Sequence, residues 1–141
     1  MWHSDFADRL HVWHELRTSC AELPLEDALT QINEFWHQTP WVAHYLHWDD
    51  IETWPDPWQL LSDNTYCELA RGLGILYTIS MLARADLTTA ELVLTEDDYN
   101  LVYVNDEKYI LNWDLEVLIN TPQKHKIKRK LTLEQLKQQY K

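Results

Sequence analysis

Glycine and cysteine are both scarce, with only two of each among 141 residues. So few glycines argue against an all-β fold with many tight turns, and they exclude a glycine-rich phosphate-binding loop. Two cysteines and no signal-like N-terminus suggest a reducing compartment. No stretch approaches the roughly 20 consecutive apolar residues of a membrane span. We expect one domain over residues 1–120, followed by an arm over residues 121–141.

Basic side chains are scarce until the end of the chain. Residues up to Glu116 include 22 acidic and five basic side chains, a net charge of −17, whereas the remainder has seven basic and one acidic, a net charge of +6. The acidic body should repel nucleic acid and anionic membranes. The basic end offers a surface for nucleic acid phosphates, for an acidic protein, or for the chain's own acidic body.

Tryptophan is abundant, and five of the eight tryptophans fall between residues 36 and 58. An aromatic segment of this kind either closes the core as a wedge or forms a surface for a partner. We predict partner-binding residues in this segment and in the basic arm: Trp41, Trp48, Trp54, Trp58, Lys124, Lys126, Lys128, Arg129 and Lys130.

Apolar spacing predicts the elements. Residues 4–22 and 24–38 have apolar side chains every three to four positions, which indicates two amphipathic helices. Asp56 and Pro57 are a suitable N-cap and first residue for a short helix. Residues 63–84 form a longer helix that is apolar almost all round and should be buried. Its two glycines, Gly72 and Gly74, make sense if another backbone approaches closely there.

Alternating residues predict three strands near 91–95, 101–104 and 108–113. Asn105-Asp106-Glu107 predicts a hairpin turn between the last two. The predicted fold class is therefore α+β: N-terminal helices and a buried central helix packed on a three-stranded antiparallel meander, with a basic C-terminal arm.

Cys67 lies at the start of the central helix. Thr65 and Glu68 fit a capping box, which would place this thiol in the first turn, where the helix dipole favours a thiolate. The alternative is a small buried residue that packs at a helix start. Cys20 lies on the apolar stripe of the first helix and is expected to be a buried structural thiol.

The order of a helix with a leading cysteine, a strand, a hairpin and an acid at the end of the last strand resembles the transglutaminase-like branch of the papain-type cysteine fold. In that family a histidine begins the next-but-one strand and an aspartate ends the strand after it. The resemblance places Cys67 at the nucleophile position and Asp114 at the position of the orienting acid. Asn100 falls where the histidine should be, and an amide cannot act as the base. The resemblance thus implies vestigial candidates and no working catalytic residue, unless His44 or His47 enters the site from the aromatic segment.

The sequence predicts no cofactor and no metal. His11 and His14, and likewise His44 and His47, have the spacing of zinc ligands, but no cysteine accompanies either pair at metal spacing. We therefore expect surface or partly buried histidines.

The residues from Trp48 to Thr78 also resemble small structural proteins of tailed bacteriophages. Together with the aromatic segment, the acidic body and the basic arm, this favours a non-enzymatic virion component of the tail, neck or baseplate. Its partners would be other structural proteins of the assembly or further copies of itself. The alternatives are a cysteine enzyme that acts on amides, by hydrolysis or transamidation, and an acidic regulator that binds a host protein.

Overall fold

A computed structural model describes residues 2–43, 45–113, 116–119 and 126–139. The chain is α+β, as the sequence predicts. Its elements in order are α1 (Phe6–Cys20), α2 (Leu25–His37), the 3-10 helix η1 (Trp48–Thr53), α3 (Pro57–Asp63), α4 (Glu68–Ser80), β1 (Ala90–Thr95), β2 (Asn100–Val104), β3 (Tyr109–Leu111), β4 (Leu118–Ile119), β5 (Ile127–Thr132) and α5 (Leu133–Gln139).

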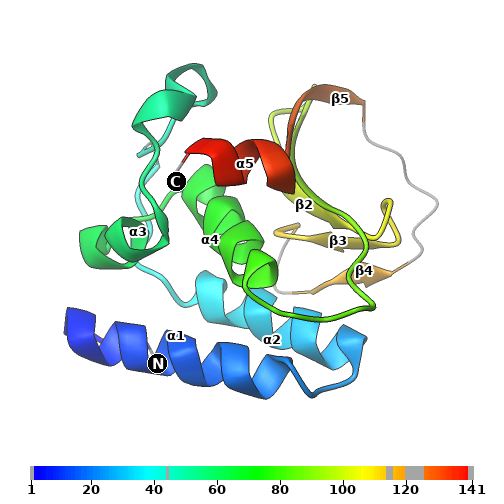
Figure 1. Ribbon diagram of the computed structural model, residues 1–141. Coiled ribbons are helices and arrows are strands. Elements are labelled where there is room, and N and C mark those ends of the chain that lie inside the picture. Colours follow the sequence, from blue (N-terminus) through cyan, green and yellow to red (C-terminus); the bar gives the residue numbers. More distant parts are fainter. Residues whose placement is uncertain (1, 44, 114–115, 120–125, 140–141) are drawn as a thin grey trace.

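Helix α4 is the centre of the molecule, between the helical layer and the sheet (Figure 1). It packs on α2 on one side and on β1 and β2 on the other. This arrangement follows from its composition, because a helix that is apolar on every side must be covered on more than one side. Every residue from Leu69 to Ile79 except Arg71 is buried. The prediction of a buried central helix is confirmed.

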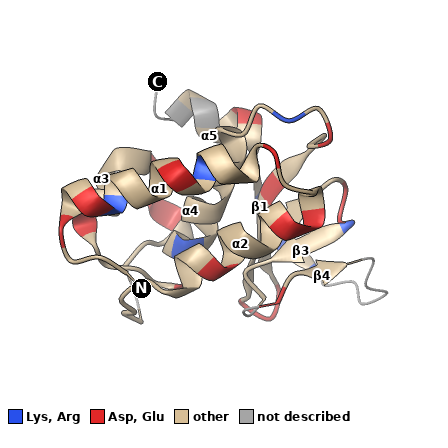
Figure 2. Ribbon diagram, turned by 90° about the horizontal axis from the view of Figure 1, so that it is seen from below, with Lys and Arg blue, Asp and Glu red and all other residues tan. Residues whose placement is uncertain are grey.

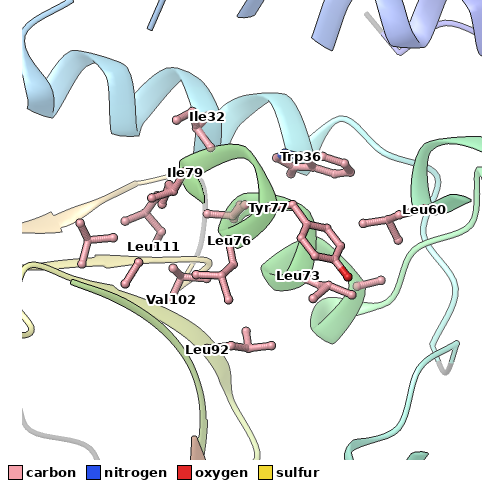
Figure 3. Close-up of a cluster of buried hydrophobic side chains, with 14 of the residues drawn as sticks. Ile32, Trp36, Leu60, Leu73, Leu76, Tyr77, Ile79, Leu92, Val102 and Leu111 are labelled. Carbon is pink, nitrogen blue, oxygen red and sulfur yellow. The ribbon is translucent and has the colours of Figure 1, made fainter. Parts of the chain in front are cut away.

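Over the residues that the structure describes, the sheet has five antiparallel strands in the order β4-β3-β2-β1-β5. Val102 pairs with Leu92 on one side and with Leu111 on the other. All three side chains lie on the face that covers α4 (Figure 3). The hairpin between β2 and β3 is confirmed: Asn105, Asp106 and Glu107 all have positive φ, between 54° and 73°.

The two glycines of α4 leave room for side chains, whereas the sequence predicted the approach of another backbone. A Cβ atom at Gly74 would lie 2.6 Å from the ring of Trp36. A Cβ at Gly72 would lie 2.9 Å from Leu92 Cδ1 and 3.2 Å from Asn112 Nδ2. The large indole from α2 therefore packs directly against the helix backbone (Figure 3).

A single hydroxyl joins three helices in this core. Thr78 Oγ1 accepts hydrogen bonds from the indole Nε1 of Trp13 on α1, at 2.9 Å, and of Trp36 on α2, at 3.0 Å. The same hydroxyl donates to the carbonyl of Gly74 at 2.8 Å. Because all these groups are buried, the bonds satisfy donors that would otherwise be costly in an apolar interior.

The described part of the predicted basic arm lies within the fold. Strand β5 pairs with β1, so the predicted three-stranded meander is the middle of a wider sheet. Leu131 of β5 and Leu136 of α5 are buried in the main core. The basic side chains dominate this segment's sequence and obscure the few apolar positions that fix it to the sheet.

Acidic residues, 23 against 12 basic ones in the sequence, are spread over several helices and loops (Figure 2). Two of the predicted arm's basic residues pair with this acidic body. Arg129 Nη1 lies 3.0 Å from Asp49 Oδ1, and Lys130 Nζ lies 3.8 Å from Glu91 Oε2. Within the described ranges, no helix has the length and apolar character that crossing a membrane requires.

Candidate functional site

The N-terminus of α4 places Cys67 at the edge of the core. Helix α4 begins at Glu68, and Cys67 is its N-cap with extended backbone dihedral angles. The predicted capping box is wrong, since Thr65 lies before the cap and the Glu68 carboxylate accepts from Asn100 N at 2.8 Å. The thiol therefore stands just ahead of the first unpaired N–H groups of the helix, where a negative charge is favoured.

A hollow of about 320 Å³ opens beside this helix end. Its wall includes Cys67, Glu68, His47 and Asn100. Cys67 is only 4% exposed, and its Sγ accepts a hydrogen bond from the backbone N–H of Leu46 at 3.5 Å. The thiol and a backbone donor thus come together from segments about 20 residues apart in the sequence, and His47 belongs to the wall of the same hollow.

Asn100 is the first residue of β2, at the strand start that the family resemblance assigns to a histidine. Its Oδ1 accepts from the indole Nε1 of Trp48 at 2.8 Å. Its backbone N–H donates to the Glu68 carboxylate. The side chain therefore binds the aromatic segment, and this strand start carries no imidazole.

Asn112 directly follows β3, and its φ of 66° lies in the left-handed region. Its Nδ2 donates to the carbonyl of Asn100 at 2.7 Å and to the carbonyl of Glu68 at 2.9 Å. Its backbone N–H donates to Asn33 Oδ1 of α2 at 2.9 Å. The residue that directly follows β3 and contacts Asn100 is thus an asparagine. Asp114, the predicted orienting acid, lies outside the described residues.

Burial raises the pKa of the Glu68 carboxyl, and the hydrogen bond from the Asn100 N–H opposes this rise.

Burial also raises the pKa of the Cys20 thiol, and the charge of Arg84 opposes this rise. Cys20 is fully buried in the main core. It is therefore a packed thiol, as predicted, and Cys67 is the cysteine that borders a hollow.

The aromatic segment is divided between core and surface. Trp48 is buried, and Trp54 packs edge-on against it at 5.4 Å and donates to the His47 carbonyl at 2.9 Å. Trp41 and Trp58 are about half exposed. Of the four tryptophans predicted to bind a partner, Trp48 is thus the buried one, and its indole N–H donates to Asn100 Oδ1.

The predicted basic partner-binding residues have different surroundings. Arg129 lies with its guanidinium 5.5 Å from the Trp48 ring centre and pairs with Asp49. Lys130 pairs with Glu91, while Lys126 and Lys128 are exposed. Lys124 lies outside the described residues.

Among the described residues, no group of three His, Cys, Asp or Glu side chains is placed to hold a metal ion. His11 pairs with Glu15 on the exposed face of α1. His44 lies outside the described residues. His47 lines the hollow of Cys67, a position that its spacing from His44 did not suggest.

Sequence reasoning missed Asn112 and Glu68 as site residues. The sequence pattern predicts a strand that continues through Trp113, whereas β3 ends at Leu111. The pattern therefore predicts Asn112 as a strand residue and not as a residue of the site. Glu68 was assigned to a cap, and its contact with Asn100 spans 32 residues.

No protein-family model and no curated protein matches the sequence. Among solved structures, the chain is similar to LapG of Legionella pneumophila, with a TM-score of 0.68 and 15% sequence identity. The match covers 92% of this chain and 77% of LapG. LapG is a transglutaminase-like cysteine protease. The chain has a transglutaminase-like fold.

This comparison overturns the leading functional prediction. A non-enzymatic bacteriophage structural protein was predicted, but the matching structure is that of a cysteine protease, and no finding supports a phage or virion role. The prediction failed because the phage resemblance rested on composition and on one stretch of sequence, whereas the fold involves nearly the whole chain. The prediction that the chain is not an enzyme is corrected on the same ground.

Proposed function

We propose that this protein is a cysteine-dependent enzyme that acts on amides, by hydrolysis or by transamidation, with Cys67 as the nucleophile and His47 as the base. The observation that carries this proposal is that Cys67, at the N-terminus of the buried helix α4, and His47 line one hollow. The likeness to LapG supports the reaction class, because the two chains share a fold.

The proposed reaction follows from the groups in the hollow. His47 takes the proton from the Cys67 thiol, and the thiolate attacks the amide carbonyl carbon. Collapse of the tetrahedral intermediate breaks the C–N bond, the imidazolium returns the proton to the departing amine, and a thioester remains on Cys67. Water or a second amine then releases the acyl group.

The backbone N–H of Leu46 has a defined place in this scheme. It donates to Sγ at 3.5 Å and thus lies where negative charge resides on the thiolate. A backbone donor fixed at such a point stabilises developing charge without reorganisation. The segment before η1 would thereby supply both a donor and the base.

The proposed base comes from a different part of the chain than the histidine of the family pattern. The strand start that should carry a histidine has Asn100, whose amide oxygen is engaged by Trp48. Among the described residues that line the hollow, His47 is the histidine. The base would therefore come from the chain before α4, and not from the sheet after it.

Alkylation of the folded protein by iodoacetamide tests the proposal, with the modified cysteine located by mass spectrometry. We expect Cys67 to be alkylated, Cys20 to stay unmodified, and the rate to fall at least about tenfold in His47→Gln, since general-base assistance typically contributes 10²–10⁴-fold. His11→Gln is the matched control, because His11 is an exposed histidine remote from the hollow. Equal rates for the wild type and His47→Gln contradict His47 as the base.

Turnover requires a second measurement. With 4-nitrophenyl acetate as acyl donor, an acyl-enzyme should appear as a burst of nitrophenol, and the burst should vanish in Cys67→Ala. A folded protein that shows no burst, and whose Cys67 resists alkylation, is not the enzyme proposed.

A further inference from the structure

A second hollow lies next to that of Cys67, and the two share Trp41 and Glu68 in their walls. The second hollow holds about 220 Å³ and is lined chiefly by Trp41, Tyr99, Trp113, Arg71 and Asn112. We call it the aromatic subsite. Its space is several times the roughly 30 Å³ that one water occupies in the liquid, so it has room for a large side chain.

Trp41 is held in place while its ring remains accessible. The backbone around it forms a short parallel bridge to Tyr66, with Val42 N donating to Tyr66 O at 2.8 Å and Tyr66 N to Pro40 O at 3.1 Å. Trp41 as a whole is nevertheless 54% exposed. A large aromatic side chain that is fixed by its backbone and left open to solvent is preorganised for contact with a ligand.

Arg71 supports one face of this indole. Its guanidinium lies 4.8 Å from the ring centre, and Nε and Nη2 each donate to Thr39 at 2.9 Å. Because Arg71 comes from α4, one turn after Cys67, the aromatic subsite and the thiol are positioned by the same helix.

Tyr99 and Trp113 add two further aromatic rings to the wall, which also includes His37. Tyr99 is 40% exposed, and its ring centre lies 4.8 Å from that of Trp113. Ligand sites in proteins are typically lined by aromatic and apolar side chains with a few polar groups that fix orientation. The aromatic subsite has this composition and opens next to the candidate nucleophile.

We propose that the aromatic subsite binds an aromatic side chain of a peptide substrate, next to the carbonyl that Cys67 attacks. This inference rests on the proposed function. Aromatic rings make up most of the wall, and the two charged groups already have partners: Arg71 is bound to Thr39 and lies over Trp41, and the Glu68 carboxylate accepts from the Asn100 N–H. A neutral aromatic ring needs no new ion pair and stacks on the walls.

Affinity labels with different side chains test the inference. Cys67 displaces chloride from a chloromethyl ketone, so that a C–S bond forms as the C–Cl bond breaks. We expect N-tosyl-phenylalanine chloromethyl ketone to label Cys67 at least about tenfold faster than N-tosyl-lysine chloromethyl ketone. The ratio of the two rates should fall towards one in Trp41→Ala. Trp58→Ala, which removes an equally exposed tryptophan on α3, should keep the wild-type ratio.

The outcomes separate this inference from the proposed function. If both reagents label Cys67 at equal rates, or if Trp41→Ala keeps the preference, the aromatic subsite is overturned while the nucleophile stands. If neither reagent labels Cys67, a binding measurement that does not depend on the thiol tests the aromatic subsite. N-acetyl-phenylalanine amide, added to the Cys67→Ala variant, should shift the indole N–H resonance of Trp41 more than N-acetyl-lysine amide does. Equal or absent shifts overturn the subsite.

Discussion

The indole Nε1 of Trp48 donates a 2.8 Å hydrogen bond to Oδ1 of Asn100, across 52 residues of sequence. The bond fastens the 3-10 helix η1 to the start of β2. Cys67 lies in the wall of the hollow that both of these segments border. The pairing therefore holds two parts of this wall together.

Trp48→Phe tests this bond. The ring keeps most of its packing, but Asn100 loses its donor at a partly buried position. We expect a loss of about 1–3 kcal/mol in the free energy of unfolding, measured with urea. Trp58→Phe is the control, because Trp58 is half exposed, and it should change stability by less than about 0.5 kcal/mol. Equal effects in the two variants would show that the bond adds nothing to stability.

Local patterns predicted much of the fold, and long-range contacts account for what they missed. The α4 helix, the three central strands and the Asn105–Glu107 hairpin follow from apolar spacing and turn chemistry over fewer than 20 residues. The wider sheet does not, because β5 is joined to β1 through backbone pairing, and its sequence is dominated by lysine and arginine.

The candidate site was also predictable only in part, because it combines local sequence patterns with contacts between distant residues. Cys67 and Asn100 stand at element starts that the sequence pattern marks. The role of Asn112 depends on a left-handed backbone and on Asn33, which lies 79 residues earlier. His47 enters through an irregular segment whose course is set by Trp48 and Trp54, and no periodicity describes it.

Thr78→Val should be among the most destabilising single changes in the core. The shape of the side chain is retained, but the indoles of Trp13 and Trp36 both lose their acceptor in a buried environment. Each unsatisfied donor costs about 1–3 kcal/mol, so we expect a loss of about 2–5 kcal/mol on urea unfolding. Thr18→Val is the matched control, since its hydroxyl is exposed and bonds only within α1. A loss below about 1 kcal/mol for Thr78→Val would mean that the indoles find other acceptors.

Glu68 should make stability depend on pH in the direction opposite to that of most carboxylates. Burial raises its pKa in the folded state, so between the unfolded and folded pKa values the folded protein binds more protons. Its contribution to stability is therefore present below the unfolded pKa and is lost as pH rises through the folded pKa.

The variant Glu68→Gln isolates this contribution. The stability of the wild type relative to Glu68→Gln should decrease from pH 4 to pH 7, as measured by urea unfolding at each pH. Glu15→Gln, on the exposed face of α1, controls for the general effect of removing a carboxylate. A difference that stays constant with pH, or that grows as pH rises, is incompatible with the raised pKa.

The last prediction adds a histidine at the strand start that the family resemblance assigns to one, and a carboxylate next to it. Asn100→His and Asn112→Asp together would put an imidazole at the start of β2 and a carboxylate directly after β3. Asn112 Nδ2 already lies 2.7 Å from the Asn100 carbonyl, so the two positions are neighbours. An imidazole beside a thiol raises its thiolate fraction, and a carboxylate orients the imidazole. We expect iodoacetamide to alkylate Cys67 about tenfold faster, or more, than in the wild type at pH 7.

The gain in alkylation rate should persist when His47→Gln is added, because the new base replaces the native one. Asn112→Asp alone should give no gain. If the double variant folds, as judged by its urea transition, and reacts no faster than the wild type, then an imidazole at the start of β2 does not activate the Cys67 thiol.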